Sequence, residues 1–129
     1  MNKEALPRNW LIVDDHVEDA KLIAQSIPEG SKTVDIAHDL ETAEYQLKHK
    51  IYDIVILDYY FKGTNKTGVD LIPVIRQLFP GLPLIMISSS DELSIVREAM
   101  KQGADFFVKK YPISTITTTL IHLIFHHKF

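Results

Sequence analysis

The stretch Ile54-Val55-Ile56-Leu57-Asp58 determines how we interpret the rest of the chain. Its four aliphatic residues are too few to span a membrane and are typical of a strand that is buried on both faces of a parallel sheet. In an open α/β sheet, ligands bind just beyond the carboxyl ends of the central strands. We therefore expect the Asp58 carboxylate to lie in a binding crevice rather than in the core.

Two other apolar runs also end in polar residues. The run at residues 10–13 is followed by Asp14 and Asp15, and the run at residues 84–87 is followed by Ser88. The carboxyl ends of neighbouring parallel strands meet at one edge of a sheet. If these strands are neighbours, three carboxylates and one hydroxyl converge at that edge.

Such a cluster needs positive charge, because acids so close together cannot all stay ionised unaided. Ligand sets made only of oxygen favour a hard cation that keeps several waters, so we expect Mg²⁺ before Zn²⁺. A further strand at residues 105–108 leads to Lys109 and Lys110, and one of these ammonium groups would reach the same edge. The sequence thus predicts a site with a metal, a nucleophilic carboxylate, a hydroxyl and a lysine.

Strand and helix patterns alternate along the chain. The second strand, Thr33–Ala37, is less apolar than the others, which is typical of an edge strand. The first helix is expected to end at Pro28 and Gly30, and residues 112–127 are assigned to a helix on their 3.6-residue periodicity, although their threonines weaken that assignment. Five strand–helix units predict an α/β fold, a three-layer sandwich around a parallel sheet.

The helix after the fourth strand has an apparent start signal. Ser89 and Glu92 have the spacing of a capping box, with Ser89 at the N-cap. The apolar residues Leu93, Val96 and Met100 follow at helical spacing. We therefore expect these three side chains to face the core.

Composition limits the classes of function. The 129 residues carry a net charge of −3, so nothing suggests direct binding to nucleic acid. We expect residues 1–8 to be a loose lead-in and residues 9–129 to form one domain. There is no cysteine, no signal-peptide pattern and no apolar run long enough to cross a membrane. These features lead us to expect a cytoplasmic protein that does not bind membranes.

The polar residues at the strand ends form a known pattern. They are Asp14 and Asp15, Asp58, Ser88 and Lys110. With these residues at these spacings, residues 9–127 resemble the receiver domain of bacterial two-component response regulators, such as the chemotaxis response regulators. Lys110 is the match rather than Lys109, because Lys110 follows Gly103 by seven residues, as in the family pattern.

The resemblance implies a flavodoxin-like fold, with a five-stranded parallel sheet in the order 2-1-3-4-5 and five helices. It also implies that Asp58 accepts a phosphoryl group from the phosphohistidine of a sensor histidine kinase or a histidine phosphotransfer protein. Such a domain is not a conventional enzyme, since it catalyses its own phosphorylation and its own dephosphorylation. The implied role is phosphorelay signal transduction.

The resemblance also assigns roles at the site. It implies these ligands for Mg²⁺: Asp14 through water, Asp15, Asp58 and the backbone carbonyl of Tyr60. Lys110 and the Ser88 hydroxyl would hold the phosphoryl oxygens. Ser88 and Phe107 would then move together as a switch that reports phosphorylation, although an aromatic residue such as Phe107 is equally suited to the core.

The implied output surface is made by the fourth helix, the fifth strand and the fifth helix, and it would contact a downstream protein or output domain. In the fifth helix Ile121 and Phe125 lie four residues apart, outside the main apolar stripe, so this surface could also form a homodimer. The alternative is that these two side chains pack into the core. His122 and His126 have a spacing that can bind a metal, but a helix C-terminus also favours His.

The chain departs from the family pattern at several positions. Phe61 and Lys62 replace a Met-Pro pair, and Gly68, expected to open the third helix, comes two residues later than usual. Tyr111 stands where the family has a proline, and Pro112 follows it.

Two other functions stay open. The departures allow a degenerate receiver that binds proteins independently of phosphorylation. A Mg²⁺-dependent phosphatase with an aspartyl nucleophile would need a second acid two residues after Asp58, where this chain has Tyr60.

Overall fold

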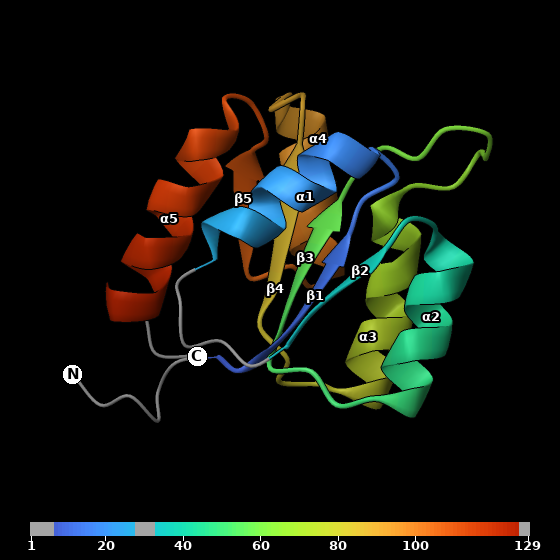
Figure 1. The fold of residues 1–129 in the computed structure, drawn as a ribbon. Helices are drawn as coiled ribbons and strands as arrows, with labels where there is room; N and C mark the ends of the chain where they lie inside the picture. Colours follow the sequence, from blue (N-terminus) through green and yellow to red (C-terminus); the bar gives the residue numbers. More distant parts are fainter. Residues whose placement is uncertain (1–6, 28–32, 127–129) are drawn as a thin grey trace.

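The computed structural model describes residues 7–27 and 33–126, which form one sheet flanked by helices (Figure 1). The strands are β1 (Asn9–Val13), β2 (Thr33–Ala37), β3 (Ile54–Asp58), β4 (Leu84–Ser88) and β5 (Phe106–Lys109). The helices are α1 (Val17–Ser26), α2 (Leu40–His49), the 3₁₀ helix η2 (Gly68–Leu71), α3 (Ile72–Leu78), α4 (Leu93–Gln102) and α5 (Ile113–His126). Residues 1–6, which the sequence assigns to the lead-in, lie outside the described residues, as do Pro28 and Gly30.

The five strands are parallel and follow the order β2-β1-β3-β4-β5, which confirms the predicted flavodoxin-like topology. β1 and β3 are neighbours, with Val13 opposite Leu57. The strand order reverses at this pair, since β1 leads outward to β2 while β3 leads to β4 on the other side. The residues that follow β1 and β3 therefore meet in the crevice where open α/β sheets bind ligands.

The sheet is buried on both faces, as the continuous apolar run of β3 predicts. Successive residues of a strand point to opposite faces, so β1 and β3 each supply two apolar layers. The layer under α1 and α5 includes Trp10, Ile12, Ile23, Ile54, Ile56, Ile116 and Leu120. The layer under α2 and α3 includes Leu11, Leu47, Val55, Leu57, Ile72 and Ile75. Figure 1 shows these helices on the two sides of the sheet.

β2 lies at one edge of the sheet, as its weaker apolar pattern predicts. Four of its five residues are only partly buried, and Ala37 alone is fully buried. A strand with one neighbour and partial cover does not need a continuous apolar run.

The start and the buried face of α4 differ from the prediction. The helix begins at Leu93 with Glu92 as its N-cap, and no side chain caps it, so the capping box assigned to Ser89 and Glu92 is wrong. Ile95 and Ala99 are the buried residues of α4, whereas Leu93 and Met100 are 61% and 41% exposed. Ile95 and Ala99 are four residues apart and share one face, and the small Ala99 side chain lets that face pack on the core.

The apolar periodicity by which residues 112–127 were assigned to a helix agrees with α5 where its side chains are described. Ile116 and Leu120 are buried, and Ile113 is partly buried. Ile121 is 41% exposed, so it does not pack into the core. The side chains of residues 123–126, which include Phe125 and His126, lie outside the described residues. Among the helices that the structure describes, none has the length and hydropathy to cross a membrane.

Candidate functional site

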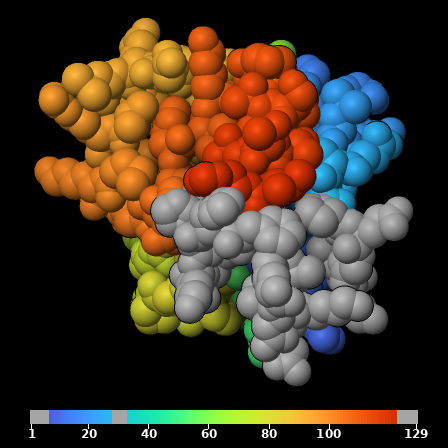
Figure 2. Space-filling view, turned by 90° about the vertical axis from the view of Figure 1, so that its left-hand side faces the viewer, coloured from blue at the N-terminus to red at the C-terminus, as the bar shows by residue number. Residues whose placement is uncertain are grey.

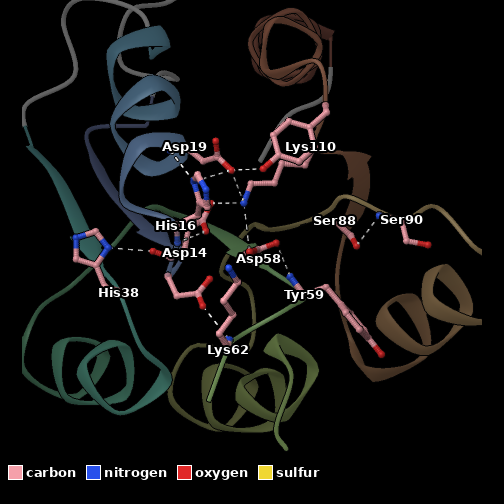
Figure 3. Close-up of polar contacts among 12 residues, drawn as sticks. Asp14, His16, Asp19, His38, Asp58, Tyr59, Lys62, Ser88, Ser90 and Lys110 are labelled. Atoms are coloured by element: carbon pink, nitrogen blue, oxygen red, sulfur yellow. Dashed lines mark hydrogen bonds and ion pairs between the residues drawn. The ribbon is translucent and has the colours of Figure 1, made fainter. Parts of the chain in front are cut away.

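Three carboxylates meet at the carboxyl ends of β1 and β3. Asp14 and Asp15 follow β1, Asp58 ends β3, and one oxygen from each lies within 4.8 Å of the others. We call these three residues the acidic cluster, and Figure 3 labels two of them, Asp14 and Asp58. Asp14 and Asp58 are almost fully buried, and Asp15 is partly buried. The structure therefore brings together the three acids that the sequence predicted to converge.

Backbone N–H groups hold each carboxylate of the acidic cluster in place. The contacts are His16 N to Asp14 Oδ1 at 2.9 Å, Tyr59 N to Asp58 Oδ1 at 2.9 Å and Lys62 N to Asp15 Oδ2 at 2.8 Å. Each of these bonds fixes one oxygen of its carboxylate. The second oxygens of Asp14 and Asp58 both turn toward the same ammonium group.

That ammonium group belongs to Lys110. Its Nζ lies 2.8 Å from Asp14 Oδ2 and 3.3 Å from Asp58 Oδ2, and the residue is 3% exposed. Lys109, in contrast, is exposed. The lysine at the site is thus the one that the family spacing selects.

A fourth acid, Asp19, also contacts Lys110, and it was not predicted from the sequence. Asp19 lies in the first turn of α1 and is 6% exposed, and its Oδ2 is 3.0 Å from Lys110 Nζ. The same oxygen accepts a hydrogen bond from the Tyr111 hydroxyl. Acids are common in the first turn of any helix, so Asp19 gave no special signal. Its position in the first turn of the helix that follows β1, six residues after Val13, was the available clue.

Burial and the ion pairs of Lys110 together shift the pKa values of three residues at the site. Burial raises the pKa of Asp58 to about 7, and the charge of Asp14 adds to this rise while Lys110 opposes it. Burial alone would lower the pKa of Lys110, but its close contact with Asp14 and the charges of Asp58 and Asp14 outweigh burial and raise that pKa. Burial alone would raise the pKa of Asp19, but hydrogen bonds from Tyr111 and Lys110 hold it below its usual value.

The other predicted site residues lie at the end of β4, in the loop after β3 and in β5. Ser88 ends β4 and is fully buried, and its hydroxyl oxygen accepts a hydrogen bond from the Ser90 N–H at 3.1 Å. Tyr60 is 45% exposed and lines the same pocket as Asp58. Phe107 in β5 is partly buried and packs against the core layer under α2 and α3.

The loop after β3 keeps a close contact despite its extra length. Tyr60 and Thr67 form an antiparallel bridge across the loop, and the Gly68 N–H donates to the Tyr59 carbonyl at 2.8 Å. A Cβ on Gly68 would lie 2.0 Å from the Asp58 carbonyl oxygen, so only glycine fits there. The backbone of Gly68 thus packs directly against the residue that ends β3.

Two residues of this loop that depart from the family pattern, Phe61 and Lys62, lie in different environments, one in the core and one beside the site. Phe61 is 8% exposed and packs in the core layer under α2 and α3. The Lys62 side chain extends from the loop toward the acidic cluster (Figure 3). At the other side of the site, the peptide bond between Tyr111 and Pro112 is cis.

The acidic cluster fits a divalent cation. Its oxygens are close enough to share one ion, and they are the hard ligands that Mg²⁺ prefers. Asp14 Oδ2 is buried and accepts no hydrogen bond from the described residues, although it lies 2.8 Å from the Lys110 ammonium nitrogen. An oxygen with this spare capacity can take a metal-bound water.

The acidic cluster is open to solvent through a pocket of about 260 Å³. The residues that line this pocket are Asp15, His16, Asp58, Tyr60, Lys62, Ser89, Lys110 and Tyr111. A buried carboxylate that lines a small open pocket, beside a lysine, can act as a nucleophile toward an anionic group that enters from solvent.

Comparisons with known proteins agree with this geometry. The family model described as "Response regulator receiver domain" matches residues 10–120. The chain is 27% identical over 100 residues to the nitrogen assimilation regulatory protein NtrX of Azorhizobium caulinodans, a match that covers 78% of this chain and 22% of that protein. The chain thus spans about a fifth of the length of this relative.

Solved structures show the same fold. The receiver domain of NtrX from Brucella abortus has a TM-score of 0.78 at 24% identity, covering 92% of this chain and 99% of that one. A response regulator from Burkholderia pseudomallei, solved with a phosphorylated aspartic acid, a calcium ion and citrate, has a TM-score of 0.79 at 20% identity, covering 91% of this chain and 66% of that one. From its fold, its strand-end residues and the match over residues 10–120, this chain belongs to the response regulator receiver domain family.

Proposed function

We propose that the chain accepts a phosphoryl group on Asp58 from a phosphohistidine of a histidine kinase or a histidine phosphotransfer protein. The observation that carries this proposal is the placement of Asp58, which lies in the acidic cluster, 3.3 Å from the Lys110 ammonium nitrogen and in the lining of an open pocket. In the transfer, an Asp58 oxygen forms a bond to phosphorus while the bond from phosphorus to the histidine nitrogen breaks. The nitrogen keeps the electron pair of that bond.

The acidic cluster would hold Mg²⁺ through Asp14, Asp15 and Asp58, with the Tyr60 carbonyl as a further ligand. When bound, the ion would neutralise negative charge on the phosphoryl oxygens. Lys110 would donate N–H groups to the same oxygens. The backbone N–H of Tyr59 holds Asp58 Oδ1 at 2.9 Å, and the Lys110 ammonium nitrogen lies 3.3 Å from Asp58 Oδ2, so the carboxylate is fixed at both oxygens.

The Ser88 hydroxyl would also contact the phosphoryl group, and with Phe107 it would report phosphorylation as the family pattern implies. In the present structure that hydroxyl accepts the Ser90 N–H, so it keeps its own proton to donate. Its contact with a phosphoryl oxygen would add one donor to those of Lys110.

We also propose that α4, β5 and α5 form the surface that contacts a downstream protein or output domain, or a second copy of the chain. These elements lie next to one another on one side of the molecule (Figure 2). Leu93, Met100 and Ile121 contribute exposed apolar side chains to α4 and α5. Partly exposed apolar groups on neighbouring elements are suited to a protein partner. A signalling role through protein partners is the function that this surface supports best.

A degenerate receiver that binds proteins independently of phosphorylation is the second candidate. Its support is that Asp14, Asp19 and Asp58 together occupy the Lys110 ammonium group. A phosphatase with an aspartyl nucleophile has less support, because Tyr60 offers no second carboxylate.

Incubation with acetyl phosphate and Mg²⁺, followed by intact mass measurement, tests the proposal. Phosphorylation predicts one added phosphoryl group on the parent and none on Asp58→Asn. A parent that gains no phosphoryl group from acetyl phosphate or from a phosphohistidine donor would favour the degenerate receiver. Rapid release of inorganic phosphate from monoester substrates would favour the phosphatase.

A further inference from the structure

Asp19 is a buried carboxylate outside the acidic cluster, and it is built into the fold at several points. Its Oδ2 is 3.0 Å from Lys110 Nζ and accepts the Tyr111 hydroxyl. Its own backbone N–H donates to His16 Nδ1 at 3.4 Å, the contact that caps α1. Figure 3 shows Asp19 and Lys110 directed toward each other above Asp58. Its side chain and its backbone are therefore both fixed beside the lysine.

The three ion-pair partners of Lys110 are not equivalent. An ammonium group has three N–H donors, and three carboxylates lie within 3.3 Å of this one. Asp14 and Asp58 belong to the acidic cluster, so a cation bound there would compete with Lys110 for their oxygens. Asp19 is not part of that cluster. It can keep its contact with Lys110 whether or not a cation is bound.

We propose that Asp19 is a positioning residue that holds Lys110 and partly neutralises its charge, and so restrains phosphorylation of Asp58. The proposal rests on the function proposed above for Asp58 and Lys110. By occupying one N–H donor, Asp19 limits how many the ammonium group can offer to a phosphoryl group. Its negative charge also repels an anionic phosphodonor.

The same negative charge favours a cation at the acidic cluster, for two reasons. It attracts the cation directly, and it draws Lys110 away from the carboxylates that the cation needs. Asp19 and Asp58 contact the same nitrogen at 3.0 and 3.3 Å, so these two carboxylate oxygens lie within about 6 Å of each other, where charges still interact strongly. Removal of the Asp19 charge should therefore weaken cation binding and speed phosphoryl transfer. General damage to the site would weaken both.

Asp19→Asn tests this pair of opposite effects, since it removes the charge and keeps the size. Calorimetric titration should show Mg²⁺ affinity lowered by about threefold to tenfold, from the loss of one charge at this distance. Initial rates with acetyl phosphate at saturating Mg²⁺ should rise by a similar factor of about three to ten. Asp19→Glu restores the charge and should move both values back toward those of the parent.

Glu18→Gln is the matched control. It removes one negative charge from the neighbouring residue of the same helical turn, where the side chain is 75% exposed and forms an ion pair with Lys21 at 3.9 Å. Both readouts should stay close to those of the parent, because exposed charges are screened by solvent and salt. Equal changes in Glu18→Gln and Asp19→Asn would mean that net charge, not the contact with Lys110, is responsible, and would overturn the proposal.

The remaining outcomes are also decisive. A fall in both Mg²⁺ affinity and phosphorylation rate in Asp19→Asn would indicate a purely structural role and overturn the proposal, as would no change in either. If the parent is not phosphorylated at all, the function proposed for Asp58 fails, and unchanged Mg²⁺ affinity in Asp19→Asn would separately refute the role of Asp19. If Asp19→Asn does not fold, Asp19→Ser is measured in its place, with the same two expected directions.

Discussion

Replacement of Asp58 by asparagine should stabilise the protein above neutral pH. Burial and the charge of Asp14 raise the pKa of Asp58 from 3.8 to about 7. Each unit of pKa difference between the folded and unfolded states corresponds to about 1.36 kcal/mol, so ionised Asp58 costs the folded state about 4 kcal/mol. Asparagine has nearly the same shape and never ionises. Its weaker contact with Lys110 reduces the gain, so we expect the free energy of unfolding at pH 8 to rise by about 2–4 kcal/mol.

The added stability of the asparagine variant should increase with pH and never decrease. In the parent, the folded state binds the Asp58 proton more tightly than the unfolded state, so stability falls as the pH rises from about 4 to about 7. The asparagine variant lacks this loss. The difference between the two proteins should therefore be small at pH 4, grow to its full size near pH 7 and stay constant above that.

Urea unfolding at pH 4, 6 and 8 in buffer with a chelator measures this difference directly. Asp91→Asn, a change of the same type at an exposed position, should show no comparable gain. Added Mg²⁺ should stabilise the parent and reduce the advantage of the variant, because the cation neutralises the acidic cluster. Our account of charge repulsion at the site would be refuted if the asparagine variant were less stable than the parent at pH 8. It would also be refuted if the two proteins differed in free energy of unfolding by the same amount at pH 4, 6 and 8.

Three further predictions concern neighbouring residues. Lys110→Ala should lower the free energy of unfolding by about 3 kcal/mol at pH 8 and slow phosphorylation, because it leaves buried carboxylates without their counter-charge, whereas exposed Lys109→Ala should do neither. Mg²⁺ should raise the melting temperature of the parent much more than that of Asp15→Ala, and equal shifts would remove Asp15 from the metal site. Gly68→Ala should cost about 3 kcal/mol in urea unfolding, since its Cβ would lie 2.0 Å from a backbone carbonyl oxygen, whereas Gly81→Ala, with open space around it, should cost far less.

The fold could be predicted because its strands are short apolar runs with one consistent pattern. β3 has no polar residue before Asp58, and that alone indicates a strand covered on both faces. The packed face of α4 could not be predicted in the same way. Leu93, Val96 and Met100 are at helical spacing, but Ile95 and Ala99, which are also four residues apart, lie on the face that is buried. Spacing indicates that a helix is amphipathic, while the packing partner decides which residues are buried.

At the site, too, the sequence could predict some residues and not others. Asp14, Asp15 and Asp58 were predictable because a residue at the carboxyl end of a parallel strand has a fixed place in the sheet. Asp19 and Tyr111 are 92 residues apart, and their contact depends on how α1 and the segment after β5 pack against each other. No local pattern records such a contact. The sequence does indicate that the carboxylates at one sheet edge need positive charge nearby. Lys110 alone cannot neutralise them, since its single positive charge is shared among three carboxylates. A divalent cation or a proton on Asp58 must supply the rest, so metal binding, protonation of Asp58 and the hold of Asp19 on Lys110 are expected to be coupled.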